Sequence, residues 1–118
     1  MMDDNMLIYD YDGTPIYYDY DGKPITSLLE WHYLFREPRH VGKDEHGDIL
    51  VSTVWLGLNH RFGPGKPLIY ETMIFKGEHD EYTMRYSSYD EAKAGHRQAC
   101  KLAFGIDYEP EEFEGMFR

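Results

Sequence analysis

ILVSTVWLGL at residues 49–58 and LIYETMIF at residues 68–75 are the two stretches that decide the fold. Both are rich in apolar and β-branched residues, and the segment between them, NHRFGPGKP, is rich in turn formers, so they predict two antiparallel strands. EYTMRY at residues 81–86 follows a further turn and predicts a third strand. The three segments together predict an antiparallel three-stranded meander.

Two capping boxes predict where helices begin. SLLE at residues 27–30 precedes apolar residues at helical spacing and predicts a helix over residues 28–37. SYDE at residues 88–91 predicts a second helix that runs to about residue 104, before a glycine. One face of this helix carries small side chains that permit close contact with a sheet: Ala92, Gly95, His96, Ala99 and Ala103. The expected fold class is therefore α+β, with the C-terminal helix on one face of the meander.

Pairing the strands symmetrically about their loops places Trp55 opposite Glu71 and Glu71 opposite Arg85. The Glu71–Arg85 pair then has two interpretations, a structural cross-strand pair or the polar floor of a ligand pocket. The sheet face away from the C-terminal helix would carry Val51, Thr53, Trp55, Ile69, Glu71, Met73, Phe75, Thr83 and Arg85. Such an apolar face requires a cover, which we expect to be the first helix, the N-terminal segment or a second copy of the chain. A homodimer is predicted on this basis.

Length and charge limit the class of protein. The chain has 118 residues, a net charge of −10 and one cysteine, which predicts a single domain without a disulfide, in a reducing cytoplasm. Residues 1–25 and 105–118 form acidic arms around a nearly neutral body, residues 26–104. An acidic chain repels phosphate backbones, so we expect no direct binding of nucleic acid. The acidic N-terminus and the lack of a long apolar run predict neither a signal peptide nor a membrane segment.

The N-terminal arm contains a repeat with a nine-residue period. YDYDGTPI at residues 9–16 is followed by YDYDGKPI at residues 18–25, and each copy predicts a short strand and a glycine turn. An EF-hand calcium loop does not fit, because its first ligand position would fall on Ile8 or Tyr17. Four acids of the repeat could still hold a cation loosely: Asp10, Asp12, Asp19 and Asp21.

Aromatic residues alternate with acids in both arms, which is a composition found at protein interfaces. The candidate partner-binding residues are Tyr9, Tyr11, Tyr18, Asp19, Tyr20, Asp21, Phe113 and Phe117. Their expected partner is a protein with a basic surface. The alternative is that the arms are solvated faces that keep a small domain soluble.

The loop at residues 59–66 is basic and glycine-rich, and could hold an anion through side chains and backbone N–H groups. It lacks the glycine spacing and the following helix of a P-loop, so a plain hairpin loop is the alternative. The candidate ligand-binding residues are Trp55, Asn59, His60, Arg61, Lys66, Glu71 and Arg85.

Signatures of catalysis and of tight metal binding are missing from the sequence. It contains no G-x-S-x-G, no H-E-x-x-H and no pair of cysteines. His60, Glu71 and His96 are the one set that could converge on a metal, and we expect His96 instead to be a hydrogen-bonded residue at the helix interface. The sequence therefore predicts no catalytic residue, no metal and no cofactor, and a non-enzymatic protein.

Three stretches resemble a group of small uncharacterised proteins of tailed actinobacterial phages and related bacterial genomes. They are YDYDGKPI with SLLEW (18–31), VSTVWLGLNHRFG with PLIYETMIF (51–75) and RYSSYDEAKAGH (85–96). The resemblance assigns no activity and no catalytic residue. It implies an accessory phage protein in the host cytoplasm, which would bind and modulate a host protein. The alternatives are a trap for a small phosphate-containing ligand and a minor virion or assembly component.

Overall fold

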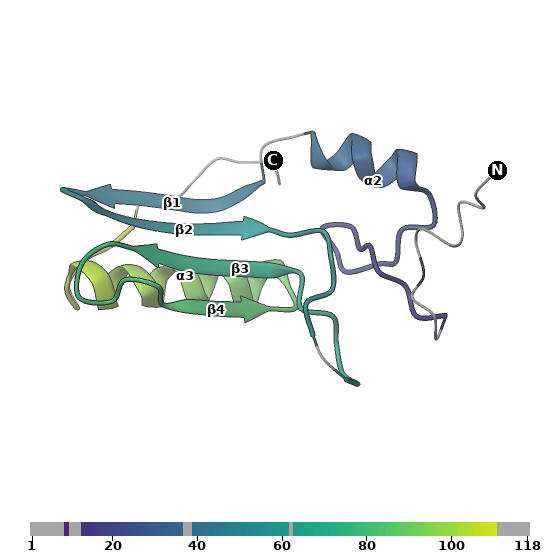
Figure 1. Cartoon of the computed structure of the whole chain (residues 1–118). Helices are drawn as coiled ribbons and strands as arrows, with labels where there is room; N and C mark the ends of the chain where they lie inside the picture. The colour runs from purple at the N-terminus through teal and green to yellow at the C-terminus, as the bar shows by residue number, and fades with distance from the viewer. Residues whose placement is uncertain (1–8, 10–12, 37–38, 62, 111–118) are drawn as a thin grey trace.

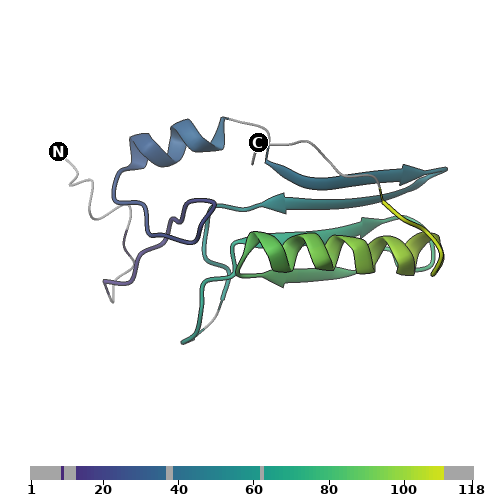
Figure 2. The same ribbon diagram turned by 180° about the vertical axis from the view of Figure 1, so that it is seen from behind.

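The described part of the chain forms four strands and two helices. The computed structural model describes residues 9, 13–36, 39–61 and 63–110. One antiparallel sheet has the order β1 (His40–His46), β2 (Ile49–Trp55), β3 (Tyr70–Phe75) and β4 (Thr83–Tyr86). α3 (Tyr89–Phe104) lies along one face of the sheet, whereas α2 (Leu28–Phe35) lies beyond one end of it (Figure 1, Figure 2). The α+β class, with its C-terminal helix on the sheet, is confirmed.

Both helices begin at the predicted capping residues. The Ser27 hydroxyl accepts the Glu30 backbone N–H at 3.3 Å, and the Ser88 hydroxyl accepts the Glu91 backbone N–H at 3.1 Å. Each cap satisfies a backbone donor that has no partner inside the helix. α3 ends at Gly105, whose φ of 120° is in the region that favours glycine.

β1 is an additional strand that the sequence pattern did not predict. It reads HVGKDEH, pairs with β2 along most of its length and contains an irregularity between His40 and Gly42. Its polar residues do not alternate with apolar ones, because only part of one face is buried. The ladder with β2 therefore stabilises this strand more than its own residue preferences do.

The register between β2 and β3 differs by one residue from the symmetric pairing. Trp55 pairs with Tyr70 and Val54 pairs with Glu71, although the predicted pairing of Glu71 with Arg85 is confirmed. The loop is asymmetric because Gly57 has a φ of 74° and Leu58 forms a bridge with Tyr17 of the N-terminal segment. The slip exchanges the two faces of β2.

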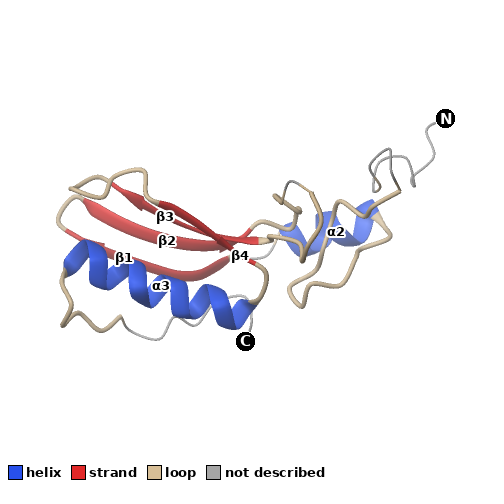
Figure 3. Ribbon diagram, turned by 90° about the horizontal axis from the view of Figure 1, so that it is seen from below, coloured by secondary structure: helices blue, strands red, loops and turns tan. Residues whose placement is uncertain are grey.

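The corrected register changes the sheet face that points away from α3. Val51, Thr53 and Trp55 lie on the α3 side, so β2 contributes Leu50, Ser52 and Val54 to the other face. No described element covers that face, and α2 lies past the end of the strands (Figure 3). The predicted set of residues on this face was therefore wrong for β2, and its cover by a second copy of the chain stays a prediction. The face also carries polar side chains, as is common for antiparallel sheets with one solvated side: Lys43, Glu45, Glu71, Thr83 and Arg85.

In the described residues, the two copies of the N-terminal repeat form matching isolated bridges rather than regular strands. Tyr9 bridges Pro15 in the first copy and Tyr18 bridges Pro24 in the second, nine residues further on. The turn glycines have nearly equal φ values, 81° at Gly13 and 84° at Gly22. The sequence repeat is thus a structural repeat, and its second copy is tied to the sheet.

Two apolar clusters flank a polar layer between α3 and the sheet. In the first cluster, residues of the N-terminal segment, the sheet and α3 meet, and Trp31, Leu34 and Phe35 of α2 pack against them. The buried members are Tyr18, Val41, Trp55, Ile69, Tyr70 and Ala92. The second lies toward the C-terminal end of α3 and contains Val51, Ile74, Ala99 and Cys100. Three buried polar residues lie between the two clusters: Thr53 on β2, Thr72 on β3 and His96 on α3. Along each of these elements, the polar residue stands between a member of the first cluster and a member of the second.

α3 approaches Tyr86 of β4 closely at Gly95. A Cβ atom there would overlap the ring and hydroxyl of Tyr86, which is held by a hydrogen bond to Thr72. We predict that Gly95→Ala lowers the free energy of unfolding by about 1–3 kcal/mol, although alanine is the better helix former by about 0.5–1 kcal/mol. Urea unfolding measures the change. Ala94→Gly, at an exposed site in the same helix, is the control, because it measures only the difference in helix propensity between alanine and glycine. A Gly95→Ala protein as stable as the wild type would contradict the prediction.

Candidate functional site

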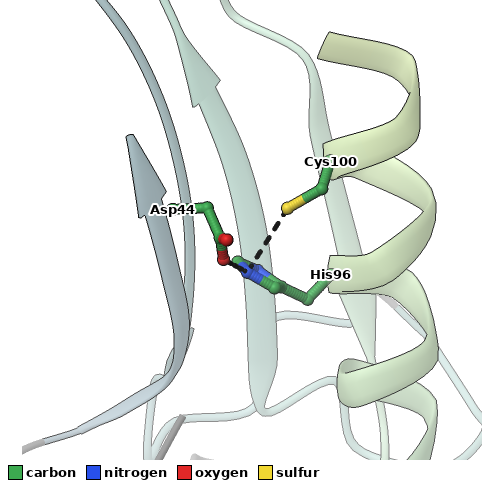
Figure 4. Close-up of side chains that lie close together, drawn as sticks. All are labelled: Asp44, His96 and Cys100. Carbon is green, nitrogen blue, oxygen red and sulfur yellow. Dashed lines mark hydrogen bonds and ion pairs between the residues drawn. The ribbon is translucent and has the colours of Figure 1, made fainter. Parts of the chain in front are cut away.

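Three chemically different side chains meet under α3. Asp44 comes from β1, and His96 and Cys100 come from α3 (Figure 4). The Nε2 atom of His96 lies 2.7 Å from Oδ1 of Asp44 and 3.5 Å from Sγ of Cys100. One ligand atom from each residue lies within 4.8 Å of the others. We call these three residues the buried triad.

Local geometry explains how the buried triad forms. His96 and Cys100 are four residues apart on α3, so they share its inner face. Gly42 on β1 leaves room for the imidazole, because a Cβ atom there would lie only 2.5 Å from Cδ2 of His96. Asp44 follows two residues later on the same side of β1 and reaches the ring from the sheet.

A second layer of hydrogen bonds holds the buried triad. Nδ1 of His96 lies 2.7 Å from Oγ1 of Thr53, which in turn lies 2.5 Å from Oγ1 of Thr72. The Tyr86 hydroxyl donates to Thr72 at 3.1 Å, and the Tyr108 hydroxyl donates to Oδ2 of Asp44 at 2.6 Å. Both ring nitrogens and both carboxylate oxygens are therefore engaged, as buried polar groups require.

The thiol of Cys100 is not an activated nucleophile. Burial is the main cause that raises its pKa to about 12, and the neighbouring carboxylate of Asp44 adds to the shift. Reactive cysteines are instead partly exposed and have lowered pKa values. Cys100 has no exposed surface.

The structure tests the metal set that the sequence suggested. His96 is buried and hydrogen-bonded at the helix interface, as predicted. Glu71 pairs with Val54 and Arg85 on the face away from α3, so it does not converge with His96. The grouping of His60, Glu71 and His96 was therefore wrong, and the buried triad includes a different carboxylate.

The sequence contained one signal for the buried triad, the spacing H-x-x-x-C at residues 96–100 on a helix face of small residues. Asp44 had no local signal, because it lies 52 residues before His96 and on a strand that was not predicted.

The candidate ligand-binding residues lie apart. Trp55 is fully buried on the α3 side, whereas Glu71 and Arg85 form an ion pair at 2.9 Å on the other face. In the loop, the Asn59 side chain accepts backbone N–H groups of Arg61 and Leu68, and Nε of Arg61 donates to the Lys66 carbonyl. His60 forms a backbone hydrogen bond to Leu68 in the same loop. These contacts give Asn59 and Arg61 structural roles, and the candidate residues are divided between the loop and the two faces of the sheet.

The aromatic residues of the second repeat copy are anchors inside the molecule. Tyr18 is 7% exposed and packs in the first core cluster. The Tyr20 ring packs edge-on against Trp55 with centroids 4.5 Å apart, its hydroxyl donates to the Leu34 carbonyl, and its own carbonyl accepts from Tyr70. Three other candidates, Tyr11, Phe113 and Phe117, lie outside the described residues, and Tyr9 is half-buried in its bridge.

Acidic side chains line a surface cavity beside this anchor. The cavity measures about 250 Å³ and is lined by Asp19, Tyr20, Asp21, Glu30 and Leu34. Oδ1 of Asp19 accepts the backbone N–H groups of Asp21 and Lys23, which fixes the turn. Among the described residues, no hydrogen bond or ion pair engages the carboxylates of Asp21 and Glu30. We call this the acidic cavity.

Comparison with known proteins gives no relative: no family model, no curated protein and no solved structure matches the chain. The resemblance to phage proteins therefore stays a prediction. No helix in the described part of the chain is long and apolar enough to cross a membrane.

Tyr70 links the acidic cavity to the sheet and makes stability depend on pH. Its buried hydroxyl donates to the Tyr20 carbonyl at 2.6 Å, and burial raises its pKa above the usual 10.0. The unfolded chain loses this proton first as pH rises above about 10. We predict that the free energy of unfolding then falls by at most about 1.4 kcal/mol per pH unit for this proton.

Denaturant unfolding from pH 8 to 11 measures this effect. Tyr70→Phe should remove the contribution of Tyr70 to the fall of the unfolding free energy with rising pH. At neutral pH, the lost hydrogen bond should lower the free energy of unfolding by about 1 kcal/mol. Tyr33→Phe, at an exposed tyrosine of α2, is the matched control. Equal alkaline slopes for the wild type and Tyr70→Phe would exclude the assigned role.

Proposed function

We propose that the protein is a non-enzymatic binding protein that receives a basic side chain of a partner protein in the acidic cavity. The supporting observation is the convergence of Asp19, Asp21 and Glu30 on one cavity with an apolar wall. The charge of the whole chain, −10, favours encounter with a positively charged surface.

The cavity suits an arginine or lysine side chain chemically. Leu34 and the ring of Tyr20 offer apolar surface to the aliphatic stem. The carboxylates of Asp21 and Glu30 are exposed, so they can accept hydrogen bonds from a cationic head group. Arginine is the better fit of the two, because its planar guanidinium bonds two carboxylate oxygens at once.

The walls of the cavity are held in place before any partner binds. Asp19 fixes its own turn through two backbone hydrogen bonds, and Tyr20 is clamped by contacts to Trp55, Leu34 and Tyr70. A cavity that is already ordered loses less conformational entropy on binding. This arrangement supports recognition by the second repeat copy together with α2.

The biological setting belongs to the same proposal. A phage accessory protein in the host cytoplasm, acting on a basic host protein, agrees with the acidity of the chain and with the resemblance described above. The homodimer stays a prediction, and the mixed sheet face gives it less support than the sequence pattern did.

Point variants test the proposal better than deletion of residues 1–25, because Tyr18 and Ile25 of that segment are buried in the core. The probe is a fluorescent hexa-arginine peptide, with binding measured by anisotropy. We predict that the double variant Asp21→Asn/Glu30→Gln weakens binding at least tenfold and that added salt weakens binding to the wild type.

The control is Glu45→Gln/Asp107→Asn, at exposed carboxylates outside the cavity. Both double variants change the formal net charge from −10 to −8, so only the position differs. Equal losses of affinity in the two would mean that the peptide responds to overall charge, and the cavity would lose its assigned role.

A further inference from the structure

We propose that Asp44, His96 and Cys100 form a binding site for a transition-metal ion of the zinc type. The three residues offer a carboxylate oxygen, an imidazole nitrogen and a sulfur from two elements that lie against each other. This set is what Zn²⁺ prefers, whereas Ca²⁺ and Mg²⁺ prefer oxygen ligands alone. The site is separate from the acidic cavity and does not depend on the proposed partner binding.

Two of the three distances between ligand atoms can be compared with those of a tetrahedral site. With bonds of about 2.0 Å to nitrogen and about 2.3 Å to sulfur, a zinc ion places these two atoms about 3.5 Å apart. Nε2 of His96 and Sγ of Cys100 are 3.5 Å apart. Nε2 and Oδ1 of Asp44 are 2.7 Å apart and share a hydrogen bond, so the carboxylate must retreat by about 0.6 Å when an ion replaces the shared proton.

The surroundings already provide the outer shell that a metal site needs. Metal-bound histidines usually donate their other ring N–H to an oxygen, and Oγ1 of Thr53 lies 2.7 Å from Nδ1 of His96. The second oxygen of Asp44 accepts from the Tyr108 hydroxyl at 2.6 Å, which orients the carboxylate. A threonine hydroxyl can donate or accept, so Thr53 serves the imidazole with or without an ion at Nε2.

Proton accounting gives the site a distinct signature. With one proton on the His96 ring and no ion bound, Nε2 donates that proton to Asp44. When the ion takes the Nε2 lone pair, this proton remains on the ring at Nδ1 and is donated to Thr53. The Cys100 thiol binds as thiolate and releases its proton to solvent, so one proton leaves per ion.

Cobalt titration tests the site in the full chain. The protein is treated with a chelator, kept reduced with a phosphine and titrated with Co²⁺. We expect visible bands of tetrahedral Co²⁺ and a thiolate-to-cobalt charge-transfer band, both saturating at one ion per chain and lost when Zn²⁺ is added. Because Cys100 is the single cysteine of the chain, the charge-transfer band identifies it in the wild type without any substitution.

Variants identify the other two ligands. Asp44→Asn and His96→Gln should each weaken Co²⁺ binding at least tenfold, in line with the loss of a metal ligand or its support. His79→Gln, at a histidine outside the cluster, is the matched control and should leave the titration unchanged. Circular dichroism checks the fold of each variant.

Several results would overturn the proposal. One is the absence of a charge-transfer band at stoichiometric Co²⁺, and another is saturation at half an ion per chain, which would mean that two chains share the ion through their cysteines. Unchanged binding in folded Asp44→Asn and His96→Gln would also overturn it, because Cys100 would then bind the ion alone. If these variants fail to fold, the band and the stoichiometry of the wild type decide the question.

Discussion

The burial of His96 between α3 and the sheet is the constraint on which much of the structure depends. A buried imidazole is costly unless its nitrogens are bonded, and here Thr53 engages Nδ1 while Asp44 engages Nε2. Its ring needs space, which Gly42 provides, and its carboxylate partner must come from β1. The polar edge strand β1 is therefore tied to the core by a hydrogen bond as well as by its ladder with β2.

The polar layer around His96 also divides the molecule into two parts with different tasks. On one side, Trp55 and Tyr70 join the sheet to the N-terminal turns and to α2, where the acidic cavity lies. On the other side, Cys100 and its apolar neighbours pack under the C-terminal end of α3. The proposed partner site thus lies beside the first cluster, whereas the proposed metal site joins the polar layer to the second cluster.

Local sequence signals predicted the parts of the fold that are determined locally. The capping boxes at Ser27 and Ser88 gave the helices, because a cap depends on residues within one turn. The pairing of Glu71 with Arg85 was likewise correct, since a short turn joins β3 to β4. The strand register beyond Gly57 was not predictable, because Leu58 leaves the hairpin to pair with Tyr17.

The candidate sites depended on long-range contacts and were predicted less well. Asp19 and Asp21 were named from the repeat, but the cavity also needs Glu30 from α2. Cys100 belonged to no known acid-base motif beyond its spacing to His96, and Asp44 reaches His96 only through the unpredicted pairing of β1 with β2. A polar strand at a sheet edge carries little alternation, so its function in placing Asp44 was not visible in the sequence.

The state of the His96 imidazole in chelator-treated protein tests the role of this residue most directly. Long-range ¹H–¹⁵N correlation spectra report which ring nitrogen carries hydrogen. We expect a proton on Nε2, held by Asp44 and protected from exchange with water. An Nε2 without a proton, or a ring proton that exchanges as fast as that of an exposed histidine, would show that His96 does not link α3 to β1.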